Sequence, residues 1–79
     1  MFYVYVLESL VKPEHFYVGQ TKNLKLRLEE HNNGKARHTN MYRPWKIKCY
    51  IAFEEKEKAE GFESYLKSHA GRKFQKKYF

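Results

Sequence analysis

Near its start the chain reads Phe2-Tyr3-Val4-Tyr5-Val6-Leu7, and a second apolar run follows as Phe16-Tyr17-Val18-Gly19. Aromatic and β-branched residues dominate both runs, which is typical of β-strands. The connection through Lys12-Pro13-Glu14 is short, so we expect the two strands to pair as an antiparallel hairpin. Because side chains alternate along a strand, the odd-numbered residues of the first run share one face, and Tyr17 and Gly19 also share a face.

A helix is expected directly after the hairpin. Thr21 or Asn23 can cap its start, and Asn32-Asn33-Gly34 is a strong stop signal because Asn and Gly accept the left-handed backbone conformation. Residues spaced three or four apart lie on the same side of a helix. By this spacing the inward side carries Leu24, Arg27, Leu28 and His31. We therefore expect the guanidinium and the imidazole to point into the protein.

The middle of the chain contains a polar segment and a third strand. Ala36 to Pro44 reads as a basic loop, and Trp45 to Phe53 then alternates between apolar and polar residues, as expected of a strand. This alternation predicts that Ile47, Cys49 and Ile51 share one face of the sheet.

The last third is predicted to be helical, from about Lys56 to His69 and, after a break near Gly71, from Arg72 to Tyr78. Glu63 falls among the apolar residues of the first of these helices. A carboxylate that is buried without a partner costs several kcal/mol, so it needs a reason. Two reasons remain open: a partly buried salt bridge, for which Arg27 is a candidate partner, or a metal ligand at the floor of a cleft.

Length and charge narrow the possible functions. A chain of 79 residues can build a modest core, so residues 1–79 are expected to form a single domain. Its 16 Lys and Arg outweigh its nine acids and give a net charge of +7, which suits a polyanion such as nucleic acid. The alternative is that the basic residues only keep an aromatic-rich protein in solution.

Residue types exclude several kinds of site. All nine acids are glutamates, which excludes a metal site built on paired aspartates. The single cysteine, Cys49, excludes an internal disulfide and a multi-thiol zinc site, and its place in the third strand predicts a packed core thiol. No secretory signal is recognisable and the apolar stretch from Met1 to Leu7 is too short to span a bilayer, so we expect a soluble cytoplasmic protein.

Taken in order, several of these residues resemble the motifs of GIY-YIG nuclease domains. Tyr3-Val4-Tyr5 matches the first triplet and Tyr17-Val18-Gly19 the second, with the spacing typical of the family. Arg27 and His31 match its helix motif, and Glu63 matches its metal-binding glutamate. The likeness covers nearly the whole chain and is greatest to the short free-standing bacterial members, which share the segments Arg43 to Lys46, Leu66-Lys67 and Gly71-Arg72.

The resemblance implies an α+β fold: a three-stranded antiparallel sheet flanked by helices, in the order β-β-α-β-α-α. It also implies a metal-dependent endonuclease that hydrolyses phosphodiester bonds in DNA rather than RNA, with one Mg²⁺ or Mn²⁺ held by Glu63. The sequence departs from the family pattern in two places. Tyr3 and Val4 replace Gly and Ile of the first triplet, and no Asn follows Glu63, where many members have one that contacts the substrate phosphate. The second departure keeps open a rival function, a nucleic-acid-binding module of the same fold without turnover.

The resemblance assigns roles residue by residue. The expected catalytic residues are Tyr5, Tyr17, Arg27, His31 and Glu63, in which the arginine neutralises charge on the phosphate. Either tyrosine can be the base or a phosphate contact, with Tyr17 preferred. His31 can be a base, or it can hydrogen-bond a tyrosine or the phosphate. The residues expected to contact nucleic acid are Gly19, Lys35, Arg37, His38, Arg43, Arg72 and Lys73. We expect no separate DNA-binding domain, so that targeting comes from DNA structure, as in repair or recombination intermediates, from a partner protein, or from neither.

Overall fold

A three-stranded sheet is the centre of the fold. The computed structural model describes residues 1–79 apart from the side chain of His38. Its strands, β1 (Phe2–Ser9), β2 (Phe16–Thr21) and β3 (Trp45–Phe53), form one sheet in the order β2-β1-β3. The central strand β1 pairs antiparallel with both neighbours, which confirms the predicted hairpin and the predicted sheet.

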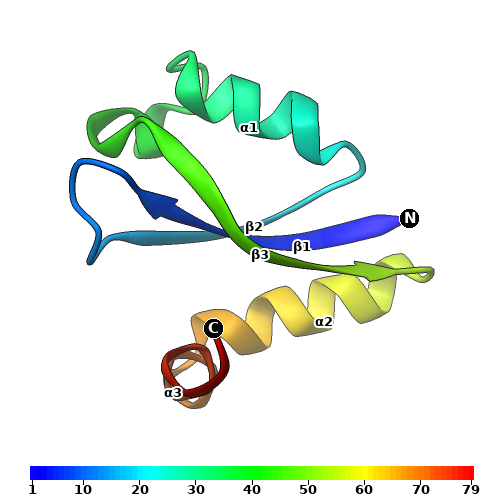
Figure 1. Ribbon diagram of the computed structural model, residues 1–79. Helices are drawn as coiled ribbons and strands as arrows, with labels where there is room; N and C mark the ends of the chain where they lie inside the picture. The colour runs from blue at the N-terminus through cyan, green and yellow to red at the C-terminus, as the bar shows by residue number, and fades with distance from the viewer.

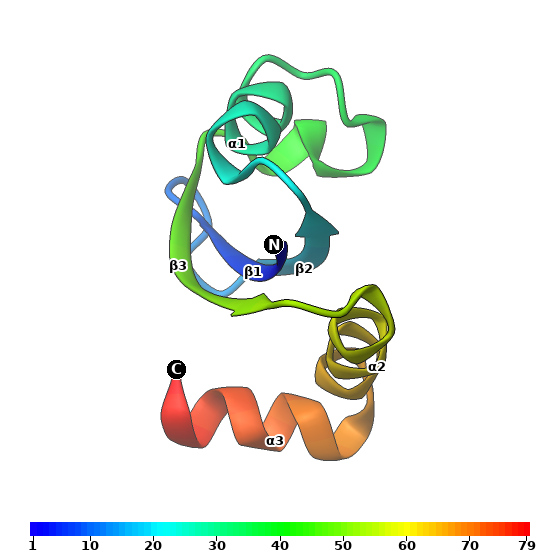
Figure 2. The ribbon, with the colours of Figure 1, turned by 90° about the vertical axis from the view of Figure 1, so that its right-hand side faces the viewer.

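Helices cover both faces of the sheet. On one face lie α1 (Leu24–Asn32) and the short 3-10 helix η1 (Arg37–Tyr42), and on the other lies α2 (Lys56–Lys67), with α3 (His69–Tyr78) packed across it (Figures 1 and 2). The element order agrees with the prediction, except that the segment expected to be a loop from Ala36 to Pro44 contains η1. None of the helices that the structure describes is long and apolar enough to cross a membrane.

The core consists of two apolar layers, one on each face of the sheet. The layer on the α2 side is made of Val4, Val6, Val18, Ala59 and Leu66. The layer on the α1 side is built around Tyr5, Leu7 and Trp45. Successive residues of β1 therefore enter opposite layers, as the sequence predicts, and Tyr5 lies at the centre of the layer beneath α1.

Strand β3 departs from simple alternation at one point. Val6 of β1 pairs with Cys49, whereas the next residue, Leu7, pairs with Ile47, so Lys48 is an extra residue in β3. Such a β-bulge reverses the facing of the residues on its two sides. Cys49 accordingly packs against the α2-side layer and Ile47 against the α1-side layer, so the predicted common face for these two residues is wrong.

The boundary between the last two helices also differs from the prediction. Gly71 lies inside α3 and not at a break, because α2 ends at Lys67 and α3 begins at His69. The chain turns at Ser68, whose hydroxyl oxygen accepts a hydrogen bond from the Gly71 N–H at 3.1 Å and so caps α3. A Cβ at Gly71 would meet the α2 backbone at Tyr65. The glycine is therefore required by the close crossing of the two helices.

Helix α1 is anchored by asparagine side chains at its two ends. At its start the Asn23 side chain accepts a hydrogen bond from the Leu26 N–H at 3.0 Å, so Asn23 rather than Thr21 is the cap. At its end Asn32 brackets the backbone of Trp45: its amide donates to the Trp45 carbonyl at 3.0 Å, and its oxygen accepts from the Trp45 N–H at 2.5 Å. These bonds fix the end of α1 against the start of β3.

Alanine at the two helical glycines should have opposite effects on stability. Gly71→Ala forces a methyl group against the α2 backbone, so we expect the free energy of unfolding to fall by about 1–3 kcal/mol. Gly61→Ala meets no atom within 4 Å and should raise it by about 0.5–1 kcal/mol, because alanine loses less entropy in a helix. Urea unfolding followed by circular dichroism measures both values. An unchanged or higher stability of Gly71→Ala would contradict the crossing geometry.

Candidate active site

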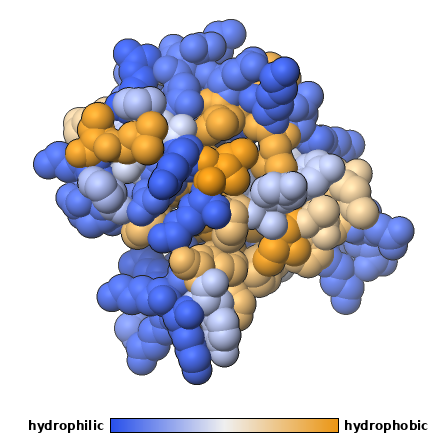
Figure 3. Space-filling view, viewed as in Figure 1, coloured by the Kyte–Doolittle hydropathy of each residue, from blue (hydrophilic) through white to orange (hydrophobic). Residues whose placement is uncertain are grey.

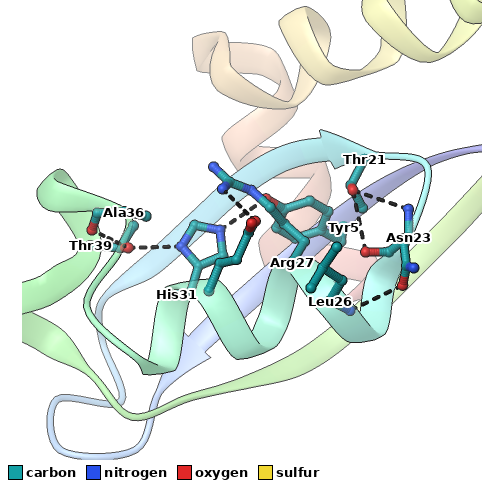
Figure 4. A network of polar contacts seen from close by, with 9 residues as sticks. Tyr5, Thr21, Asn23, Leu26, Arg27, His31, Ala36 and Thr39 are labelled. Atoms are coloured by element: carbon teal, nitrogen blue, oxygen red, sulfur yellow. Dashed lines mark hydrogen bonds and ion pairs between the residues drawn. The ribbon is translucent and has the colours of Figure 1, made fainter.

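The hydroxyl of Tyr5 is the meeting point of the candidate site. Tyr5 is 2% exposed, and its hydroxyl oxygen lies 3.0 Å from Nε2 of His31 and accepts a hydrogen bond from Nε of Arg27 at 3.3 Å (Figure 4). Burial raises the pKa of Tyr5 above its ordinary value of 10.0, and the hydrogen bond and charge of Arg27 offset this only in part. Tyr5 is therefore a neutral phenol at physiological pH.

His31 closes the inner side of this cluster. It lies near the end of α1, is completely buried, and places Nδ1 2.7 Å from the hydroxyl oxygen of Thr39. Its other ring nitrogen faces Tyr5. Three roles are open for this imidazole, namely a base, a partner of a tyrosine or a partner of the phosphate, and its contact with Tyr5 matches the second.

Arg27 forms the outer side of the cluster. Its side chain is 32% exposed, and Nη1 donates to Oε1 of Glu30 at 3.1 Å, one turn further along α1. Desolvation works against the charged form of Arg27, but the hydrogen bonds to Tyr5 and Glu30 outweigh it and raise its pKa. The guanidinium is thus a fixed cation that solvent can reach.

Tyr17 and Gly19 of β2 form the adjoining wall. The Tyr17 ring centroid lies 6.3 Å from that of Tyr5 and 5.0 Å from that of His31, and the Tyr17 side chain is only half-buried. Gly19 pairs directly with Tyr5, and a Cβ at Gly19 would meet the Tyr5 hydroxyl and lie 2.6 Å from its Cζ. The absent side chain at Gly19 therefore makes room for the buried phenol.

Glu63 belongs to α2, on the other face of the sheet, yet its charge acts on the Tyr5 hydroxyl. Its Oε2 accepts a hydrogen bond from Nζ of Lys67 at 3.0 Å, and its side chain is 23% exposed. A partly buried salt bridge is thus present, with Lys67 one turn away as the partner and not Arg27. No group of three His, Cys, Asp or Glu side chains able to hold a metal ion occurs among the described residues.

A groove of about 790 Å³ lies next to the cluster. It is lined by Tyr17, by the end of the β1–β2 hairpin and by α2 and α3, and it exists because α3 packs on α2 and stands away from the sheet (Figure 2). The bulge turns Lys48 into this groove, where its Nζ lies 4.7 Å from the ring centroid of Phe16. Against a single acid, Glu14, the groove carries the cations Lys48, Lys67, Arg72 and Lys76.

The basic residues expected to contact nucleic acid form two groups on opposite faces of the sheet. The group around η1 consists of the exposed residues Lys35, Arg37 and Arg43. The group on α3 consists of the exposed residues Arg72 and Lys73. Figure 3 shows mostly hydrophilic surface at the two ends of the view, over α1 and over α3, with apolar surface between them. The side chain of His38, also expected to make such a contact, lies outside the part of the chain that the structure describes.

Two members of the cluster are missing from the residues that sequence patterns single out. Glu30 carries a local signal, because it follows Arg27 by three residues and that spacing favours an ion pair on a helix. Thr39 carries none, because it lies in η1 and only the tertiary fold brings its hydroxyl to His31. Local periodicity cannot indicate a contact of this kind.

Two kinds of known protein are similar to this chain. The structure-specific endonuclease subunit SLX1 of Debaryomyces hansenii is 42% identical over 70 residues, which cover 80% of this chain and 20% of that protein. The UPF0213 protein of Clostridium perfringens is 41% identical over 68 residues, or 85% of this chain and 71% of the relative. A UPF0213 protein of Streptococcus pyogenes serotype M3 is 39% identical over 71 residues, which cover 89% of this chain and 75% of that protein.

The chain therefore spans only a fifth of the length of the SLX1 relative but most of the length of the UPF0213 relatives. The family model of the GIY-YIG catalytic domain matches residues 1–78. Sheet order, helix placement and the cluster around Tyr5 agree with the motifs read from the sequence. The chain belongs to the GIY-YIG catalytic-domain family.

Proposed function

We propose that this domain is an endonuclease that hydrolyses phosphodiester bonds in DNA, with one divalent cation, Mg²⁺ or Mn²⁺, held by Glu63. The observation that carries the proposal is the convergence of Arg27 and His31 on the Tyr5 hydroxyl, with the ring of Tyr17 packed beside Tyr5 and His31. Phosphodiester hydrolysis needs a cation beside the phosphate and a group that accepts a proton from water. Both kinds of group are present within this cluster.

Arg27 is suited to the phosphate. Negative charge on the phosphate oxygens increases as water attacks, and a guanidinium already in place stabilises that charge without having to reorganise. Its raised pKa keeps it positive, and its bonds to Tyr5 and Glu30 set its orientation before the substrate arrives.

Tyr17 is the better candidate for the base. Tyr5 is buried and its raised pKa keeps the phenol protonated at neutral pH, so Tyr5 is suited to holding Arg27 and not to accepting a proton from water. Tyr17 is only half-buried and borders the groove, while its ring packs on the layer that contains Tyr5.

The single carboxylate of Glu63 is suited to bind a divalent cation weakly, together with the substrate. Hard divalent cations prefer oxygen ligands, and one carboxylate binds them weakly, so water and a substrate phosphate complete the coordination. Lys67 competes for the same carboxylate oxygen, which weakens binding further before substrate is present. When bound, such an ion supplies Lewis-acid stabilisation of the phosphate oxygens.

Nucleic acid is the substrate that the charges favour. The cations of the groove lie beside Tyr17 and suit a phosphate backbone, and exposed basic residues flank the site on the η1 side as well. The SLX1 relatives of Debaryomyces hansenii and Kluyveromyces lactis are named structure-specific endonuclease subunits. These names support polynucleotide cleavage by the present domain, and the word subunit supports targeting by a partner protein.

Loss of the Glu63 carboxylate should remove the activity. We expect Glu63→Gln to lower the rate of plasmid nicking in Mg²⁺ or Mn²⁺ by roughly two orders of magnitude or more, because the amide is a poor cation ligand. The matched control is Glu60→Gln, an exposed glutamate of the same helix, which should nick at the wild-type rate. Equal nicking by wild type and Glu63→Gln would mean that the carboxylate has no role in the reaction.

The two tyrosines should differ in the pH dependence of the rate. A phenol accepts a proton only when ionised, so we expect the nicking rate to rise between about pH 6 and 9, and Tyr17→Phe to abolish this rise and lower the rate about 10²- to 10⁴-fold. Burial keeps Tyr5 protonated throughout this range, so Tyr5→Phe should lower the rate but retain the rise. Initial rates at a series of pH values give the result. Loss of the rise in Tyr5→Phe, with retention in Tyr17→Phe, would reverse the two roles.

Contacts in the groove should appear in the salt dependence of DNA binding. In the cleavage-deficient Glu63→Gln background, the pair Arg72→Gln and Lys76→Gln should reduce the slope of log Kd against log salt by about two, or one for each lost phosphate contact. The control pair Lys25→Gln and Lys58→Gln removes the same charge from exposed sites outside the groove. Fluorescence anisotropy measures both slopes. Equal slopes for the two pairs would place the DNA elsewhere.

A further inference from the structure

Thr39 ends a chain of hydrogen bonds whose donor directions can be worked out. The Thr39 hydroxyl donates to the carbonyl of Ala36 at 3.1 Å, and the same oxygen lies 2.7 Å from Nδ1 of His31. The Thr39 hydroxyl oxygen and the Ala36 carbonyl oxygen, 3.1 Å apart, attract each other only when a proton lies between them. The carbonyl carries no proton, so the Thr39 hydroxyl proton points to Ala36. The hydroxyl oxygen must then accept from His31, and Nδ1 carries the imidazole proton.

This direction decides the rest of the chain. If the imidazole is neutral, a proton on Nδ1 leaves a lone pair on Nε2, which accepts the hydroxyl proton of Tyr5 at 3.0 Å. The Tyr5 oxygen in turn accepts from Nε of Arg27 at 3.3 Å. Each group donates once to the next, from Arg27 through Tyr5, His31 and Thr39 to the backbone of Ala36 (Figure 4).

The chain runs through the interior and ends at the substrate side. Thr39 and Tyr5 are each 2% exposed and His31 is 0% exposed, so water does not compete for these bonds. Arg27, at the outer end, is 32% exposed. The described contacts of its guanidinium use two of its five N–H donors, one with Tyr5 and one with Glu30, and leave the others for a ligand.

We propose that Thr39 is a positioning residue for the reaction: through His31 and Tyr5 it holds the Arg27 guanidinium in the orientation that receives the substrate phosphate. The proposal rests on the proposed nuclease function for its catalytic consequence, but its structural content concerns this chain alone. Removal of the Thr39 hydroxyl takes this acceptor away from Nδ1, and with it the bond that favours the tautomer with its proton on Nδ1. Tyr5 then has no fixed direction for its proton, and the bond that orients Arg27 loosens.

Thr39→Val and Thr39→Ser test this arrangement. Valine keeps the shape of threonine without the hydroxyl, and serine keeps the hydroxyl without the methyl group. We expect ¹⁵N NMR of wild type to show the His31 proton on Nδ1, and Thr39→Val to lose this preference and to show increased motion of the Arg27 Nε–H. Thr39→Val should lower kcat of nicking by about ten- to a hundredfold with little change in KM, and Thr39→Ser should restore both readouts.

The outcomes separate this proposal from the proposed function. A wild-type His31 proton on Nε2, or a folded Thr39→Val with wild-type tautomer, Arg27 motion and kcat, overturns the role of Thr39. Unchanged circular dichroism shows that Thr39→Val is folded, and a stability loss shared by Thr39→Ser would indicate a packing role only. Absence of nicking by wild type overturns the nuclease assignment, while the two NMR readouts still decide whether Thr39 orients Arg27.

Discussion

The buried hydroxyl of Tyr5 is the interaction on which the site depends. It lies at the centre of the sheet, on the only strand with two neighbours, and binds two residues of α1. A buried phenol must satisfy its hydroxyl, and here the partners that satisfy it are an arginine and a histidine of the candidate site. Gly19 leaves the space that this hydroxyl occupies. The fold and the site are therefore specified by the same few atoms.

Much of the fold follows from local pattern, and the exceptions have identifiable causes. Alternation in β1 and the spacing of α1 correctly place Tyr5, Arg27 and His31 on facing surfaces. The bulge at Lys48 depends on how β3 pairs with β1, which no property of β3 alone reveals. Gly71 reads as a helix break in the sequence, whereas in the structure it permits two helices to cross.

The candidate site also contains residues that local sequence pattern predicts and residues that it does not predict. Glu63 is conspicuous in the sequence because a carboxylate in an apolar stripe violates a local rule. Thr39 violates none, since a threonine in a polar segment is ordinary, and its partner His31 is eight residues away. The candidate salt-bridge partner of Glu63 in the sequence is Arg27, whereas in the structure Lys67, one turn away on the same helix, forms the ion pair. Contacts between different helices and strands are thus the features of the site that sequence periodicity does not predict.

The anchoring of α1 has a consequence for the dynamics of the protein. This nine-residue helix leaves Leu26 exposed. It is held by the Asn23 cap, by the Asn32 side chain on the Trp45 backbone, and by the bonds of Arg27 and His31 to Tyr5. Local opening of α1 must therefore break the very contacts that organise the site. In hydrogen exchange, the backbone amides of α1 would report directly on whether the site is assembled, and a phosphate ligand that engages Arg27 would slow their exchange.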